Sequence, residues 1–254
     1  MCYRWVRLGI LFCTLLLAIG RAEPVDVLLA AASDAELRPL LARLGTPQAE
    51  AIAVWQFWHG TIAGRHVVVA RTEGDPLNAV AAVTLGIRHF GPRLVLTFGT
   101  ARAHDPALRP GDVVASERFS AFDGMETAVA AVGKGSAPLA WDRLPHALAT
   151  AGEREVPAPF FPADAGALGV ALHLALPPGR VVAGVLGSAS QVNREADRIA
   201  WLHEKWGTSC EDGESAHIAG CAQLLGVPAF GVRVIDGKEG DAAAVVLKFL
   251  EAWQ

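Results

Sequence analysis

Acidic and small polar residues stand directly after four short apolar runs of the chain. In chain order they are Ser33, Asp34 and Glu36; Gly99, Thr100, Ala101 and Arg102; Glu211, Asp212 and Glu214; and Asp236, Lys238 and Glu239. Carboxylates so placed can give a proton to a leaving group, take one from water, or stabilise positive charge that develops in a transition state. The pattern predicts that these four segments share one ligand site.

The elements that must position these residues alternate between two hydrophobic periods. Short, nearly continuous apolar runs predict buried strands at 25–32, 94–98, 112–116, 181–186 and 229–235, and β-rich runs at 51–58 and 66–71 predict a hairpin. Helical spacing predicts helices after Ser33 and at 77–90, 141–151, 193–206, 213–225 and 242–253. We therefore expect a single α/β domain with a mixed, mostly parallel central sheet flanked by helices. In such folds ligands bind beyond the carboxyl ends of the strands, where the four polar segments lie.

Composition excludes several classes of protein. Of 254 residues, 52% are hydrophobic and 19% are charged, which excludes an intrinsically disordered chain. With 22 basic and 26 acidic residues and no Lys/Arg run, the chain is not expected to bind nucleic acid. The eight histidines lack a metal-binding spacing such as His-Glu-x-x-His, so we expect neither a metal nor another cofactor.

The first 22 residues have the pattern of a secretory signal peptide. Arg4 and Arg7 precede a 13-residue apolar run, and the segment ends in small residues at Ala22. Cleavage there would leave residues 23–254 as one domain with a net charge of −7, located in the periplasm or secreted, without stable membrane association. An uncleaved anchor is the alternative.

Two cysteines remain in the mature chain, Cys210 and Cys221. An exported protein meets oxidising conditions, so the two could form a disulfide. They could equally be two buried thiols, and the sequence leaves both interpretations open.

Five segments, in the same order along the chain, resemble the nucleoside phosphorylase superfamily. Residues 99–114 are similar to its Gly-Ser-Ala-Gly-Gly … Gly-Asp-Val-Val segment, residues 211–215 to its Glu-Met-Glu-Ala element, and residues 227–236 to its Val-Pro … Val-Arg-x-Ile-Ser-Asp strand. Residues 25–41 resemble the methylthioadenosine/S-adenosylhomocysteine nucleosidase branch, and residues 74–79 are similar to the superfamily's Gly-x-x-x-Asn-Ala helix start. The resemblance implies a nucleoside phosphorylase-like three-layer fold, a homodimer or higher homo-oligomer, and cleavage of a ribosyl N-glycosidic bond.

The resemblance also implies roles for individual residues. Glu36 matches the glutamate that orients and deprotonates water, and Glu214 matches the carboxylate that binds the ribose hydroxyls, with Asp212 beside it. Thr100 and Ala101 match a turn beside the sugar and the base. The structural alternatives are ordinary acidic residues in a helix first turn and a tight turn that binds nothing.

Two departures from the family pattern concern substrate binding. Arg102 replaces a glycine and adds a cation that could bind an anion such as phosphate, or could pair with Asp105 at the surface. The position of the family's base-stacking aromatic residue is occupied by Gln191 and Val192. All three residues are predicted to contact substrate.

A third departure concerns the catalytic acid. The family's Ile-Ser-Asp is Ile235-Asp236-Gly237 here, so an ungapped match puts Gly237 where the acid belongs, whereas a one-residue deletion restores Asp236. We predict Asp236 as the acid that protonates the leaving purine. A turn-forming Asp-Gly pair is the alternative.

Three functions remain open at this point. The first is a purine nucleosidase that hydrolyses a methylthioadenosine- or S-adenosylhomocysteine-like nucleoside to free base and sugar. The second is a nucleoside phosphorylase, in which Arg102 would hold phosphate, although the negative charge of Glu36 would repel that anion. The third is an exported protein that binds a purine or nucleoside without catalysis, an interpretation motivated by Gly237.

Overall fold

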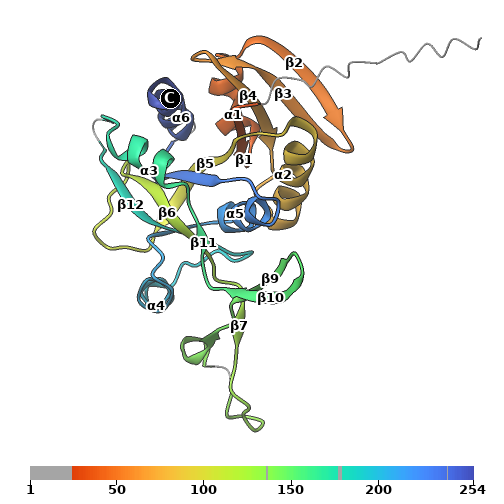
Figure 1. Cartoon of the computed structure of the whole chain (residues 1–254). Helices are drawn as coiled ribbons and strands as arrows, with labels where there is room; N and C mark the ends of the chain where they lie inside the picture. Colours follow the sequence, from red (N-terminus) through yellow and green to blue (C-terminus); the bar gives the residue numbers. More distant parts are fainter. Residues whose placement is uncertain (1–24, 136, 177–178, 239) are drawn as a thin grey trace, which may run out of the picture.

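The computed structural model describes residues 25–135, 137–176, 179–238 and 240–254 (Figure 1). The expected signal peptide, residues 1–22, lies outside the described residues. Within the described part, no helix combines the length and the apolar character needed to span a membrane.

A ten-stranded mixed sheet forms the centre of the molecule. Its strands are β1 (Val27–Ala31), β2 (Gly45–Ile52), β3 (Trp55–Ile62), β4 (Arg65–Arg71), β5 (Leu94–Ala103), β6 (Val113–Ala121), β11 (Phe161–Pro162), β12 (Val181–Ser188), β13 (Cys210–Asp212) and β14 (Ala229–Ile235). β2, β3 and β4 form an antiparallel meander, and β1 runs parallel to both β4 and β5. This part of the sheet contains the predicted parallel strands, β1 and β5, and the predicted hairpin, β3 and β4.

The sheet closes on itself like a barrel, which corrects the expectation of a mostly parallel sheet. β5 pairs with β1 through Leu94–Thr97 and with the whole of β14 through Val95–Ala101. Beyond these pairings, Arg102 and Ala103 of β5 pair with β13. β13 pairs in turn with β12, β12 with β6, and β6 with β14. The contacts of β13 with β5 and of β14 with β6 are antiparallel, so the closed part of the sheet is mixed.

Helices cover both faces of the sheet. They are α1 (Asp34–Leu41), α2 (Pro76–Phe90), α3 (Ala165–Leu172), α4 (Ala196–Trp206), α5 (Ser215–Leu224) and α6 (Asp241–Ala252). One buried cluster joins α1, α3 and α6 to the sheet face that carries Val27 and Leu29, and a second joins α2 and α5 to the face that carries Leu28. Burial of these strands on both faces explains their continuous apolar runs.

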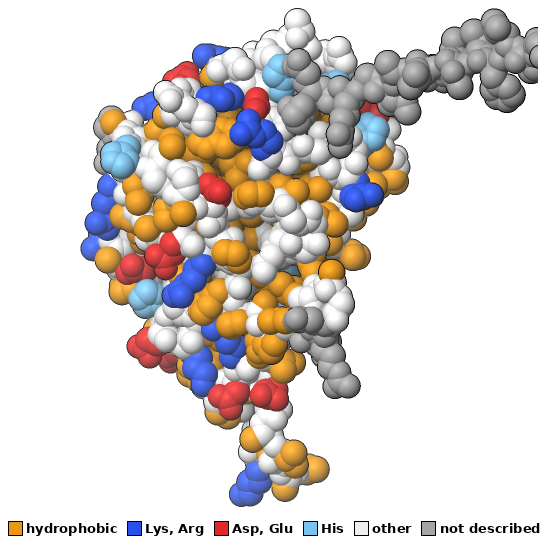
Figure 2. All heavy atoms as spheres, viewed as in Figure 1, with side chains coloured by type: hydrophobic (Ala, Val, Ile, Leu, Met, Phe, Trp, Pro, Cys, Tyr) orange, Lys and Arg blue, Asp and Glu red, His pale blue; other side chains and the backbone are white. Residues whose placement is uncertain are grey.

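Residues 123–158 form an excursion away from this body, and part of it projects at the bottom of the views in Figures 1 and 2. It contains β7 (Met125–Glu126), η1 (Pro138–Ala140), β8 (Asp142–Arg143), β9 (His146–Thr150) and β10 (Glu153–Ala158). The helix predicted over 141–151 is therefore wrong. β9 pairs antiparallel with β10, and this pairing prevails over the helix propensity of the Ala- and Leu-containing sequence.

Both cysteines of the described chain are free and buried. Burial raises the pKa of each thiol, and the Cys221 sulfur lies 3.1 Å from Thr84 Oγ1. Of the two possibilities left by the sequence, the structure has the buried thiols.

Candidate active site

The ends of several strands surround one cavity of about 550 Å³. The residues that line it are Gly74, Asp75, Pro76, Thr100, Ala101, Arg102, Ala189, Ser190, Gln191, Val192, Glu211, Asp212, Gly213, Asp236 and Gly237. The fold therefore brings the predicted Thr100, Ala101, Arg102, Gln191, Val192, Asp212 and Asp236 to one place. Glu36 and Glu214 are not among the lining residues but contact segments that are, as described next.

Glu36 bridges the ends of β1 and β5. Its Oε2 accepts a hydrogen bond from the Ala32 backbone N–H (3.1 Å), and its Oε1 accepts one from the Thr100 backbone N–H (3.2 Å). Ser33 caps α1 and accepts from the Glu36 N–H (3.4 Å), which fixes the first turn that carries the carboxylate. Glu36 therefore lies beside Thr100, as predicted, but Thr100 belongs to strand β5 and not to the turn expected there.

Gly99 makes this approach possible. A Cβ at position 99 would lie 2.5 Å from Glu36 Oε1, which is much closer than real contacts of this kind. Glycine at position 99 therefore lets β5 pass this close to the Glu36 carboxylate, which a larger residue would push aside.

Substitution Gly99→Ala is expected to push the Glu36 carboxylate away from the Thr100 N–H. If Glu36 takes part in catalysis, its displacement should lower kcat by about 100-fold, the usual effect of a catalytic group misplaced by about 1 Å. The secondary structure should be retained. Steady-state kinetics and circular dichroism measure the two effects. A Gly99→Ala protein with full activity would show that this contact is unimportant.

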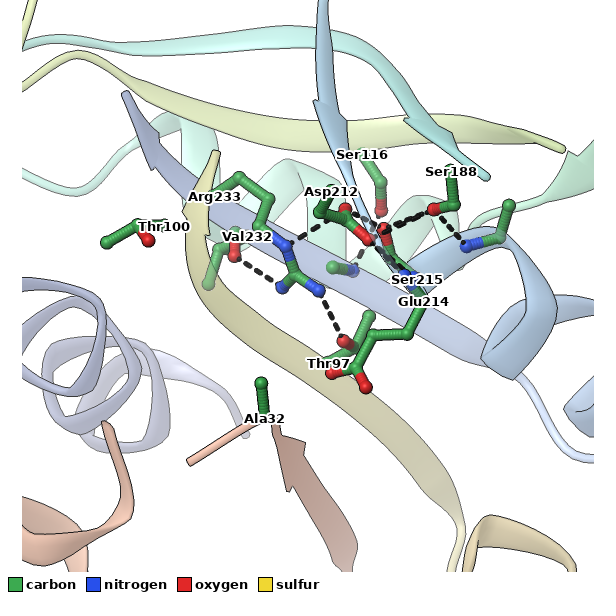
Figure 3. A network of polar contacts seen from close by, with 12 residues as sticks. Ala32, Thr97, Thr100, Ser116, Ser188, Asp212, Glu214, Ser215, Val232 and Arg233 are labelled. Atoms are coloured by element: carbon green, nitrogen blue, oxygen red, sulfur yellow. Dashed lines mark hydrogen bonds and ion pairs between the residues drawn. The ribbon is translucent and has the colours of Figure 1, made fainter. Parts of the chain in front are cut away.

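A buried ion pair joins Asp212, in the cavity wall, to Arg233 (Figure 3). Asp212 Oδ2 accepts from Arg233 Nε at 3.0 Å, and Asp212 Oδ1 accepts from the backbone N–H groups of Glu214 and Ser215, both at 2.7 Å. Arg233 also donates to Thr97 Oγ1 at 2.9 Å. Burial alone would raise the pKa of Asp212, but Arg233 and these donors hold it below its usual range.

The contacts of Asp212 indicate a positioning role. Its carboxylate is occupied by Arg233 and by the first residues of α5, so it positions Glu214. A direct contact of Asp212 with substrate stays a prediction. Arg233 was part of the quoted strand motif but was not predicted as a site residue.

Glu214 is buried at the start of α5. Its Oε2 accepts from Thr72 Oγ1 at 2.6 Å, and Thr72 is a partner that the sequence analysis missed. Burial raises the pKa of Glu214 to about 7, and the nearby negative charges of Asp212 and Glu36 act in the same direction, against Arg233 and Thr72. The group is thus poised to change protonation state near neutral pH.

Asp236 offers a carboxylate at the end of β14. Its backbone N–H donates to Ala101 O at 3.0 Å, its φ is 44°, and its side chain is exposed at the cavity. A Cβ on Gly237 would lie 2.8 Å from Val234 Cγ1 and 3.2 Å from Thr100 Cγ2. An aspartate at position 237 would therefore displace its neighbours, whereas Asp236 reaches the cavity without such a clash.

Arg102 does not pair with Asp105, which corrects that alternative. Its Nη1 donates to the Asn193 backbone carbonyl (2.7 Å) and lies 3.6 Å from Glu211 Oε1, while Asp105 accepts from the Ala107 N–H. The positive charge of Arg102 therefore has a carboxylate beside it within the cavity wall.

A third buried carboxylate, Glu211, fastens the loop that carries Gln191 and Val192. Glu211 Oε2 accepts from Asn193 Nδ2 at 2.6 Å and lies 3.1 Å from His104 Nε2, and Glu211 Oε1 accepts from the Asn193 backbone N–H. Burial opposes ionisation of Glu211, but His104 and Asn193 lower its pKa below the usual value. His104 and Asn193 carry no local sequence signal for this role, because the contacts join residues far apart in the chain.

The family of the chain follows from a comparison with known proteins. A family model described as the phosphorylase superfamily matches residues 26–254. The chain belongs to the phosphorylase superfamily. The sequence resemblance to this superfamily is thereby confirmed.

Individual relatives of this superfamily member are nucleosidases. It is 31% identical to a 5′-methylthioadenosine/S-adenosylhomocysteine nucleosidase of Psychromonas ingrahamii over 92 residues, a match that covers 36% of this chain and only 40% of that relative. A relative of the same description from Halalkalibacterium halodurans is 24% identical over 227 residues, which covers 87% of this chain and 89% of the relative.

A solved structure of the same description agrees with the fold. The nucleosidase of S. pneumoniae, determined with a transition-state inhibitor, superposes with a TM-score of 0.74 at 19% identity and covers 91% of this chain and 100% of that one. At this level of identity, the likeness concerns the fold.

Proposed function

We propose that this chain hydrolyses the N-glycosidic bond of a purine nucleoside of the methylthioadenosine or S-adenosylhomocysteine type. The observation that carries the proposal is the Glu36 carboxylate, held by the Ala32 and Thr100 N–H groups beside the cavity. The buried Glu214 lies near enough for the charge of Glu36 to affect its pKa. The nucleosidase descriptions of the relatives support the same reaction.

The proposed mechanism gives each carboxylate one task. Water attacks the anomeric carbon while Glu36 takes its proton, and the electron pair of the breaking C–N bond goes to the purine. Asp236 donates a proton to the leaving purine, which makes its departure easier. Glu214 accepts hydrogen bonds from the ribose hydroxyls, and the carboxylates stabilise positive charge that develops on the sugar.

Two features favour water over phosphate as the nucleophile. The fixed carboxylate of Glu36 would repel an incoming phosphate dianion. Arg102, the cation that could attract phosphate, lies 3.6 Å from Glu211 Oε1 and donates to a backbone carbonyl.

A substrate panel tests the proposal. Base release from methylthioadenosine, S-adenosylhomocysteine, adenosine and inosine is followed with residues 23–254 in phosphate-free buffer. We expect release of adenine from the first two. Tight nucleoside binding without any release would instead support a binding protein, and release of hypoxanthine alone would contradict the adenine preference.

The pKa of Glu214 leads to a predicted pH dependence. If ionised Glu214 binds the ribose hydroxyls, kcat/KM should rise with pH and level off above about pH 7, because the raised pKa keeps the group protonated at lower pH. The measurement is kcat/KM from pH 5 to 9, with the fold checked at each pH by circular dichroism. The Glu214→Gln variant should be slower and should lack this rise. An unchanged profile in Glu214→Gln would assign the titration to another group.

We further propose that the protein is exported after loss of residues 1–22 and acts as a homodimer or higher homo-oligomer. The basic start and 13-residue apolar run support export. The exposed parts of Trp55 and Trp58 on β3 are candidate oligomer contacts. N-terminal sequencing and sedimentation of the exported protein test these two points.

A further inference from the structure

Three side chains that commonly bind metals meet outside the cavity already described. Asp123 follows β6, His146 begins β9, and His217 lies in α5. One potential ligand atom from each lies within 4.8 Å of those from the other two. Asp123 Oδ2 is 3.1 Å from His217 Nε2, and Asp123 Oδ1 is 3.7 Å from His146 Nε2. The two imidazole rings stand at 87° to each other, with centroids 6.3 Å apart.

This spacing suits a divalent metal ion. Zinc binds imidazole nitrogen and carboxylate oxygen at about 2.0–2.2 Å, so tetrahedral ligands lie roughly 3.3–3.6 Å from one another. The observed separations of 3.1 and 3.7 Å are on either side of this range. Two histidines and one carboxylate are also the donor types that zinc and neighbouring transition metals accept.

Two histidine nitrogen atoms in this cluster lack hydrogen-bond partners within the described residues, as they could if an ion normally binds there. His146 Nε2 and His217 Nδ1 are buried, and neither has a hydrogen-bond partner within the described parts of the chain. Buried polar atoms normally have a partner, so each exception requires an explanation. A metal ion near Asp123 would supply the missing partner of His146 Nε2. His217 already presents its Nε2 to Asp123 at 3.1 Å, so this nitrogen can ligate an ion there without rotation of the ring.

The cluster lies close to the surface of the molecule. The side chains of Asp123 and His146 are 32% and 38% exposed, whereas that of His217 is 14% exposed. The cluster is therefore near enough to the surface for an ion to reach it, and its most buried ligand lies on α5.

We propose that Asp123, His146 and His217 bind one divalent transition-metal ion, with zinc as the best fit. The ion fastens the excursion of residues 123–158 to α5, the helix that begins beside Glu214. This inference stands independently of the proposed reaction, because it rests on residues that the mechanism does not use.

Zinc titration tests the site directly. The purified protein is stripped with a chelator and titrated with zinc by calorimetry, and cobalt(II) is used as a spectroscopic probe. We expect one equivalent of tightly bound zinc and the visible absorption of four-coordinate cobalt(II). His146→Gln and His217→Gln should each weaken zinc binding by at least about 100-fold, the upper end of what loss of a supporting residue costs.

His89→Gln is the matched control. His89 Nε2 lies 3.0 Å from Glu50 Oε1, so this variant also removes a histidine beside a carboxylate, but the described residues offer no third ligand there. It should bind zinc like the unmodified protein. Equal zinc binding by all variants, or no stoichiometric binding by the unmodified protein, would overturn the proposal and leave a hydrogen-bonded Asp123–His217 pair.

Limited proteolysis gives a second readout. Because an ion that binds only the folded state stabilises it, zinc should slow cleavage within residues 123–158. This protection should be absent in Asp123→Asn, whose side chain keeps its size and whose fold is checked by circular dichroism. Cleavage that zinc does not slow in the unmodified protein would contradict the fastening role.

Discussion

Replacement of Asp236 by asparagine is expected to lower kcat for adenine release by about 10²- to 10⁴-fold, the usual contribution of a general acid. Asparagine keeps the size of the side chain but cannot give a proton to the leaving purine. Since Asp236 is exposed and its backbone N–H makes the hydrogen bond to Ala101, the fold should be unaffected. Measurement of kcat and KM with methylthioadenosine separates loss of chemistry from loss of binding.

Two further variants make this test specific. Asp197→Asn changes an exposed aspartate in the first turn of α4, away from the cavity, and should retain full activity. Gly237→Asp in the Asp236→Asn background should not restore activity, because a side chain at 237 meets Val234 and Thr100. Full activity of Asp236→Asn would show that Asp236 is not the acid, whereas rescue by Gly237→Asp would contradict the steric argument at position 237.

Glu36→Gln is expected to have an effect of similar size, about 10²- to 10⁴-fold on kcat, because an amide cannot take a proton from water. There is a second physical reason. The two oxygens of Glu36 accept from different backbone N–H groups, so the NH₂ of glutamine would face one donor and leave it unpaired. Single-turnover release of adenine measures the chemical step directly.

The matched control for Glu36→Gln is Glu251→Gln, an exposed change near the end of α6 that should leave turnover unchanged. A Glu36→Gln protein that releases adenine at the unmodified rate would show that another group activates water. Thermal unfolding of both variants checks that the fold is retained.

The elements that carry the site were largely predictable, for a physical reason. β1, β12 and β14 are buried strands, so their apolar runs mark them in the sequence almost to the residue. Closure of the sheet was not predictable in this way. It depends on β5 leaving β1 after Thr97 and meeting β13 at Arg102, and pairing between distant strands has no local signature.

Two strands at the edges of the fold, β2 and β9, were not predicted as strands, because local sequence does not determine their pairing. β2 is an exposed edge strand, and its sequence lacks the apolar alternation that marks a half-buried strand. β9 contains alanine and leucine, which favour a helix in isolation, but it pairs with β10. In both cases tertiary pairing decides the structure.

In the candidate site, some residues could be predicted from the sequence and their hydrogen-bond partners could not. Residues that follow the predicted apolar runs, such as Glu36, Thr100 and Asp236, were predictable because strand ends converge, although β5 extends past Thr100 to Ala103. Their partners were not: Thr72 and Glu214 are 142 positions apart. To decide whether position 236 or 237 carries the acid, one must know which atoms surround position 237, and the sequence does not show them.

The identity of the sugar product tests the proposed hydrolysis most directly. Methylthioadenosine is incubated with residues 23–254 in buffer with and without phosphate, and the products are identified by mass spectrometry. Hydrolysis should give adenine and 5-methylthioribose at the same rate in both buffers. A sugar 1-phosphate that forms only with phosphate would contradict hydrolysis, and tight binding without any product would contradict catalysis.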